Sequence, residues 1–172
     1  MEKRGWKIVT NDITTLMFGI EDASYMAQNI VIAAESLGLG TCYLGSPIWA
    51  MDKISKKYNL PKRVVPFVQI TIGHPAEDPP SRPRYPMEFT VFEDTYPKEL
   101  DIDRAMKEMD EGYLGQKYYK NAGFMINPEP LKEEEHTFEN YGWTEHISRK
   151  LGLWMGDTEE QKALLKERGF DI

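Results

Sequence analysis

The chain has 172 residues, of which 41% are hydrophobic and 12% aromatic, a composition that suits a packed core and excludes disorder over the whole length. Its single cysteine excludes an intrachain disulfide, and the sequence shows neither a signal peptide nor an apolar run near the roughly 18 residues of a membrane span, so we expect a cytoplasmic protein without membrane contact. The net charge of −7 is concentrated in residues 93–172, which carry 11 Lys and Arg against 19 Asp and Glu. This acidic half argues against a nucleic-acid partner.

The first part of the chain predicts a short strand and then a helix. Residues 6–19 mix β-forming and small polar side chains, which favours a strand. From Asp22 to Leu37, apolar side chains recur every three or four residues, which predicts an amphipathic helix with Asp22 as its N-cap and Gly38 just beyond its end. Alanines on this stripe permit close approach of another helix, and the pattern leaves open whether that helix belongs to the same core or to a second subunit.

The next stretch alternates between helix and strand signals. Residues 46–58 begin with Ser-Pro, a typical helix start, and predict a helix. Residues 64–72 are rich in β-branched side chains and predict a strand, and residues 87–92 predict a short edge strand. Between these two, residues 76–86 are rich in proline and predict an extended surface loop.

Helix formers dominate after Glu93. Helical spacing predicts helices over residues 101–110 and 143–151, and the capping-box pattern that begins at Thr158 predicts a third helix, which ends before Gly169. Residues 112–140 read as a connector. The whole pattern predicts an α+β fold with two parts: residues 1–92 form a mixed sheet with flanking helices, and residues 93–172 form a helical extension packed on the same domain.

The octet Gly38–Gly45 is the first candidate for a binding site. The dinucleotide-binding fingerprint G-x-G-x-x-G follows a strand and has a small residue at its sixth position. This octet follows a predicted helix and has Tyr43 at the sixth position, so it does not fit the fingerprint. A backbone rich in glycine can approach a flat ring closely. Taken alone, the octet is more simply a helix stop followed by a tight turn.

The second candidate is the segment Arg82-Pro83-Arg84. Two arginines one residue apart in extended geometry can clamp one phosphate with two planar guanidinium groups. Two arginines on a proline-rich loop are otherwise usually solvated. Together with the glycine-rich octet, they suggest a phosphorylated cofactor that carries a flat ring.

This order of motifs resembles the nitroreductase family of FMN-dependent oxidoreductases. The resemblance runs from Asp22 to about Val91 and rests on three stretches: Asp22-Ala23-x-x-Met26-Ala27-Gln28-Asn29, Ala33-Ala34-x-x-x-Gly38-Leu39-Gly40-Thr41-Cys42 and Arg82-x-Arg84-x-Pro86-x-Glu88. The arginine-rich helix start and the Pro-Ser-x-x-Asn segment that precede this region in the family have no counterpart in residues 1–21. The chain therefore resembles the C-terminal part of a nitroreductase.

The resemblance implies a cofactor, a reaction and an assembly. It assigns the FMN phosphate to Arg82 and Arg84, and the flavin ring to the backbone of Tyr43, Leu44, Gly45 and Ser46. It implies hydride transfer from NADH or NADPH through FMN to a nitro compound, a quinone or a similar acceptor, in a homodimeric flavoprotein that needs no catalytic side chain. The alternative is a truncated protein without activity that acts as a dimerisation or interaction module.

The cysteine and the three histidines add no further candidate site. Cys42 has no second cysteine to pair with and no neighbouring histidine or lysine, so we expect a buried structural thiol. The three histidines lack the spacing of a zinc site, and we assign no metal.

Overall fold

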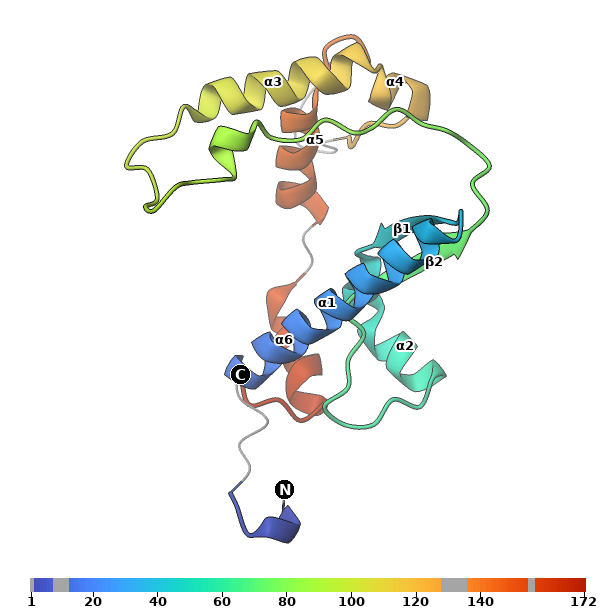
Figure 1. The fold of residues 1–172 in the computed structure, drawn as a ribbon, viewed down its shortest axis with the longest axis vertical. Helices are drawn as coiled ribbons and strands as arrows, with labels where there is room; N and C mark the ends of the chain where they lie inside the picture. The colour runs from blue at the N-terminus through green and yellow to red at the C-terminus, as the bar shows by residue number, and fades with distance from the viewer. Residues whose placement is uncertain (1, 8–12, 128–135, 155–156) are drawn as a thin grey trace. The chain divides into compact units, whose positions relative to one another are not determined.

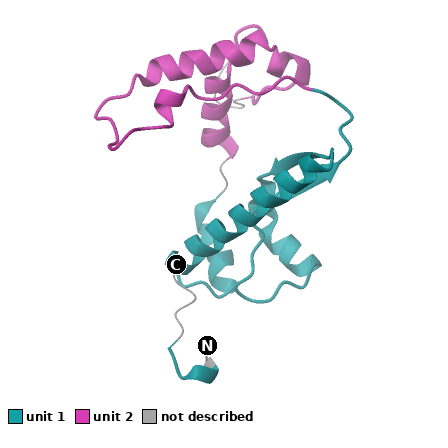
Figure 2. Ribbon diagram, viewed as in Figure 1, with its two compact units in different colours: residues 1–78, 156–172 teal, residues 79–155 magenta. Residues whose placement is uncertain are grey.

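The computed structural model describes residues 2–7, 13–127, 136–154 and 157–172. The chain divides into two compact units, residues 1–78 with 156–172 and residues 79–155 (Figure 2). The prediction placed its boundary at residue 92. The assignment of residues 1–92 and 93–172 to a flavin domain and its extension stays a prediction.

The first unit combines helices with a two-stranded sheet (Figure 1). Its elements are a 3₁₀ turn at Glu2–Arg4, α1 (Ile13–Ser36), β1 (Gly40–Leu44), a 3₁₀ turn at Ser46–Ala50, α2 (Met51–Lys57), β2 (Gln69–Gly73) and α6 (Thr158–Glu167). Mixed helix and sheet confirm the predicted α+β class. The expected helix over residues 46–58 is confirmed as a 3₁₀ turn that continues into α2.

Helix α1 begins nine residues before the predicted N-cap Asp22. Its interior face carries Ala27, Val31 and Ala34, spaced by four and three residues. Half-buried side chains at positions 16, 20 and 24 continue this stripe toward the amino end, so packing favours helix where we had expected a strand. The strand prediction is wrong over residues 13–19, and residues 8–12 lie outside the described part. Gly38 ends the helix as predicted, with a φ of +74°.

The sheet pairs β1 with β2 in antiparallel register, from Gly40 opposite Gly73 to Leu44 opposite Gln69. The predicted strand over residues 64–72 is therefore shorter at its start. A turn in which the amide of Val64 donates to Pro61 precedes it, and Pro66 has no amide hydrogen to donate to a ladder.

The C-terminal helix α6 belongs to this first unit. Asp157 caps it by accepting from the amide of Glu159 at 2.8 Å, one residue before the predicted cap. Beyond its end, the guanidinium of Arg168 donates to the carbonyl of Leu60 at 2.7 Å, and the carbonyl of Arg168 accepts from the amide of Arg63 at 2.8 Å. These bonds tie the last residues to the loop between α2 and β2.

The second unit is helical among its described residues. It contains a 3₁₀ turn at Met87–Phe89, α3 (Ile102–Gly115), α4 (Tyr118–Ala122) and α5 (Trp143–Arg149), which continues into a π turn at Lys150–Trp154. The predicted helices over residues 101–110 and 143–151 are confirmed. The predicted edge strand over residues 87–92 is wrong: this unit offers no described strand to pair with, and Phe89 instead donates its amide to Pro86. The predicted connector over residues 112–140 contains α4.

Helices α3 and α5 are joined through a close backbone approach. Asp110 on α3 accepts from the amide of Thr144 at 2.7 Å and so caps the first turn of α5. A Cβ atom at Gly142 would lie 2.4 Å from a carboxylate oxygen of Asp110, so a side chain there would displace the capping carboxylate. In Figure 1, α5 runs across α3, as this contact requires.

Candidate functional site

The residues assigned to the flavin ring lie where β1 ends. Tyr43 and Leu44 are the last two residues of that strand, and Gly45 and Ser46 open the turn before α2. The hydroxyl of Tyr43 donates to Gln28 of α1 at 3.3 Å. A Cβ atom added at Gly45 would meet nothing within 4 Å, so the backbone at this turn is open to a ligand.

The residues assigned to the phosphate lie in the second unit and differ from each other. Arg82 is half-buried: its guanidinium carbon lies 4.0 Å from the centroid of the Tyr118 ring, and one of its nitrogens donates to Gln116 at 3.5 Å. Arg84 is exposed, and its guanidinium donates to the carbonyls of Arg82 and Pro83 at 3.4 and 3.3 Å. Only Arg82 is thus held by side chains that the structure describes.

A cavity of about 370 Å³ opens beside Arg82. It is lined by Pro79, Pro80, Arg82, Gln116, Tyr118, Asn121 and Ala122. Its polar side chains include one guanidinium and two amides, all of which carry N–H donors. Such a donor set suits an anion. Sequence reasoning missed Gln116 and Asn121 because both fall in the stretch that we had read as a connector.

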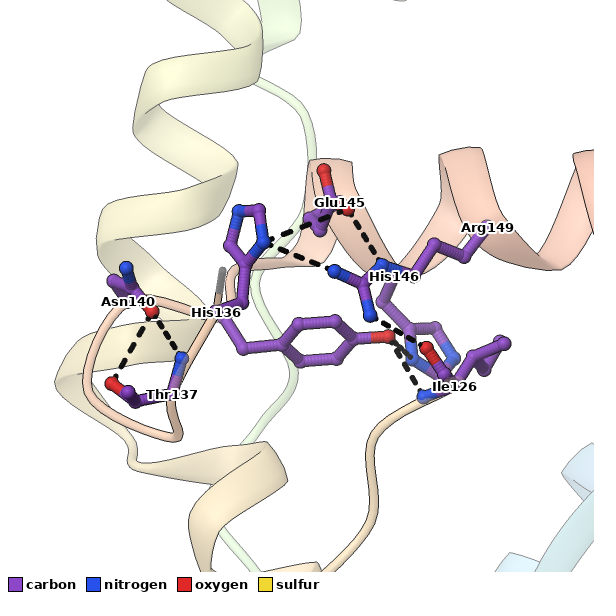
Figure 3. A network of polar contacts seen from close by, with 8 residues as sticks. Ile126, His136, Thr137, Asn140, Glu145, His146 and Arg149 are labelled. Carbon is purple, nitrogen blue, oxygen red and sulfur yellow. Dashed lines mark hydrogen bonds and ion pairs between the residues drawn. The ribbon is translucent and has the colours of Figure 1, made fainter. Parts of the chain in front are cut away.

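A polar network inside the second unit was also missed (Figure 3). The buried guanidinium of Arg149 donates to Glu145 at 2.6 Å, to the carbonyl of Ile126 at 2.7 Å and to Nδ1 of His136 at 3.0 Å. The three acceptors come from α5 and from both sides of residues 128–135. The network therefore holds Ile126 and His136, which flank that segment, against α5.

Tyr141 completes the network from the other side. Its hydroxyl accepts from the amide of Ile126 at 3.1 Å, which leaves its own proton for Nδ1 of His146 at 3.2 Å. The His146 ring stacks on Tyr119 with centroids 4.5 Å apart. Burial lowers the pKa of His146 from its ordinary value of 6.5, and the charge of Lys150 lowers it further. Burial likewise raises the pKa of Tyr119.

Cys42 is exposed on β1, so the expectation of a buried thiol is wrong. In the described part of the chain, no three His, Cys, Asp or Glu side chains gather as metal ligands. None of the helices described is long and apolar enough to cross a membrane.

Comparisons with known proteins place this chain among the nitroreductases. Residues 6–74 match the model of the nitroreductase family. The chain is 32% identical over 136 residues to the oxygen-insensitive NADPH nitroreductase of Salmonella typhimurium, and 40% identical over 80 residues to the FMN reductase (NADPH) of Bacillus subtilis. The structure of the NfrA1 nitroreductase from B. subtilis superposes on 98% of the chain with a TM-score of 0.77 and 26% identity.

The chain belongs to the nitroreductase family. This family match covers α1, the sheet and the predicted ring-binding residues 43–46, and it ends before Arg82 and Arg84. The Salmonella alignment covers 79% of this chain and 50% of the relative, and the alignment with the FMN reductase covers 46% of this chain and 32% of the relative. The B. subtilis NfrA1 structure is covered over 63% of its length. The chain thus spans between 32% and 63% of the length of these relatives.

The lowered pKa of His146 predicts how the stability of this chain depends on pH. Because its pKa is lower in the folded state, the unfolded state binds the proton more tightly, and the free energy of unfolding should fall as the pH drops below about 6.5. Urea unfolding at pH 7, 6 and 5 measures this slope. A His146→Gln variant should show a smaller slope and the exposed control His74→Gln an unchanged one. Equal slopes for both variants would refute the assignment.

Proposed function

We propose that the chain binds FMN, with Arg82 and Arg84 on the phosphate and the backbone of residues 43–46 along the flavin ring. The observation that carries the proposal is the half-buried guanidinium of Arg82, held at a cavity whose side chains include the amides of Gln116 and Asn121. A phosphate needs charge-assisted donors of this kind. The open backbone at Gly45 supports the assignment of the ring.

We further propose that the protein is an NAD(P)H-dependent flavin oxidoreductase that reduces a nitro compound, a quinone or a similar acceptor. The names of its relatives support this class of reaction. FMN, when bound, supplies the redox chemistry. The residues of this chain then bind and orient: the arginines neutralise the phosphate, and the turn at Gly45 lets the backbone come close to a flat ring.

One purification followed by one assay tests the function. The protein is expressed with excess riboflavin in the medium, and its absorbance spectrum and the mass of any released cofactor are measured. We expect a yellow protein that releases FMN and oxidises NADH or NADPH in the presence of a quinone or nitroaromatic acceptor. A colourless protein that binds no added FMN would overturn the proposal.

We propose that α1 forms a homodimer interface. Phe18, Tyr25 and Ile32 lie seven residues apart on the helix side opposite its buried face, and between 56% and 65% of each side chain is exposed. A stripe with this spacing suits packing against another helix. It also supports the alternative function, a dimerisation module, which predicts a colourless dimer.

Charge on this stripe should dissociate the dimer. We expect Phe18→Glu with Tyr25→Glu to give monomers in light scattering at tens of micromolar, because two carboxylates would be buried without partners. The matched control places the same two charges at Met17 and Ala33, which are exposed on α1 to either side of this stripe. Ala27, an obvious target from sequence, is 7% exposed inside its own unit, so its replacement would test folding instead. A monomeric wild type would refute the dimer.

A further inference from the structure

The segment Arg82-Pro83-Arg84 rests on the end of α3. A Cβ atom at Gly112 would lie 2.8 Å from Cγ and 3.0 Å from Cβ of the Pro83 ring. Both distances are too short for carbon atoms, and a proline ring cannot swing away as a flexible side chain would. Glycine in a helix interior costs about 1 kcal/mol relative to alanine. Here glycine gives Pro83 the room to approach the helix.

A second contact fixes the same segment one helical turn later. The side-chain amide of Gln116 donates to the carbonyl of Ser81 at 2.8 Å, and its oxygen accepts from the guanidinium of Arg82 at 3.5 Å. One glutamine therefore holds both the backbone before Arg82 and the side chain of Arg82. Gly112 and Gln116 are four residues apart, which places them on one face of α3.

The third contact comes from the first residue of α4. Lys117 adopts a left-handed conformation with φ of +50°, which turns the chain sharply between α3 and α4. Directly after this turn, the ring of Tyr118 lies under the guanidinium of Arg82 at 4.0 Å. A guanidinium stacked on a ring and bonded at one edge keeps its remaining N–H groups in a fixed plane.

We infer that Gly112, Gln116 and Tyr118 form a seat that positions Arg82 for a phosphate ester, and that Gly112 is retained in the helix for this purpose. The inference rests on the proposed binding of FMN, whose phosphate is the ester in question. None of the three is a catalytic residue, because each acts by holding the Arg82 side chain or the backbone next to it.

The test compares two glycines of the same helix. Gly112→Ala puts a methyl group against Pro83, whereas Gly115→Ala puts one where nothing lies within 4 Å. Affinity is measured for two probes, FMN and riboflavin, which share the ring and differ in the phosphate. Loss of one charge-assisted bond should reduce FMN affinity about tenfold to hundredfold. Riboflavin affinity should stay constant, which a general loss of structure would not allow.

We expect Gly112→Ala to lower the ratio of FMN to riboflavin affinity at least tenfold, and Gly115→Ala to leave it unchanged. Gln116→Glu should lower the ratio as well, because a carboxylate cannot donate to Ser81 and repels a phosphate. Tyr118→Phe keeps the ring and should retain the ratio, whereas Tyr118→Leu should lower it. Thermal unfolding of each variant is recorded alongside.

Three outcomes would overturn the inference. If Gly112→Ala and Gly115→Ala give the same ratio while an Arg82→Ala variant loses it, the seat is not needed and the phosphate assignment stands. If the wild type does not prefer FMN over riboflavin, or binds neither, the proposed function fails and the seat with it. If Gly112→Ala weakens both probes equally, Gly112 serves the fold alone.

Discussion

Replacing Arg82 and Arg84 together by alanine should weaken FMN binding by about two to four decades. Each arginine is expected to donate at least one charge-assisted hydrogen bond, worth about 1.5 to 3 kcal/mol. At about 1.4 kcal/mol for each tenfold change, two such bonds account for this loss. Isothermal titration of the flavin-free protein measures it. We expect Arg82→Ala to have the larger share, because Gln116 and Tyr118 already hold that side chain in place.

A charge-matched control separates contact from long-range attraction. Lys98→Ala with Lys107→Ala also removes two positive charges from exposed positions of the second unit. Neither lysine lines the cavity beside Arg82, and salt screens exposed charges that do not touch the ligand, so this control should change FMN affinity less than about twofold. Equal affinities for the wild type and the double arginine variant would refute the phosphate assignment.

The parts of the fold that sequence predicted well are those set by local signals. The end of α1 at Gly38 follows from a left-handed glycine, and α3 follows from helical spacing. The structure adds the cap of α3, where Asp101 accepts from the amide of Arg104 at 3.1 Å. The start of α1 was missed because its first turns carry β-forming side chains. Leu16 and Ile20, half-buried on the stripe that continues to Ala27, decide the structure there, and a local propensity cannot report burial.

In the candidate site, too, the local features are visible in the sequence and the long-range contacts are not. The two arginines stand out in the sequence because they lie one residue apart. The residues that hold the arginine segment do not stand out, because they are distant in the chain: Gln116 contacts Arg82 across 34 positions, and Gly112 approaches Pro83 across 29. A glycine inside a helical pattern was the available signal: Gly112 interrupts good helix formers at a cost that only a packing reason offsets. Whether the predicted site residues bind FMN stays a prediction.

Replacing Arg149 by methionine should destabilise the protein by about 1 to 4 kcal/mol. Methionine fills much of the same volume but leaves the carbonyl of Ile126, a residue only 2% exposed, without its guanidinium donor, which costs about 1 to 3 kcal/mol. The carboxylate of Glu145 is 35% exposed and regains water, so its loss of a partner adds about 1 kcal/mol at most. Urea unfolding followed by circular dichroism measures the sum.

Two further variants test whether this destabilisation comes from the buried contacts of the Arg149 guanidinium. Arg149→Lys keeps the charge but cannot reach three acceptors at once, because an ammonium lacks the planar fork of a guanidinium, so its cost should lie between the wild type and Arg149→Met. Arg104→Met removes an arginine that is 45% exposed and bonded to Glu88 at 2.8 Å, a surface pair that contributes little to stability because water and salt screen it. A loss in Arg149→Met no greater than that in Arg104→Met would show that the contacts of Arg149 with Ile126 and His136 do not stabilise the second unit. A distinctly greater loss would make this buried guanidinium a principal support of the second unit, the one that carries both predicted phosphate ligands.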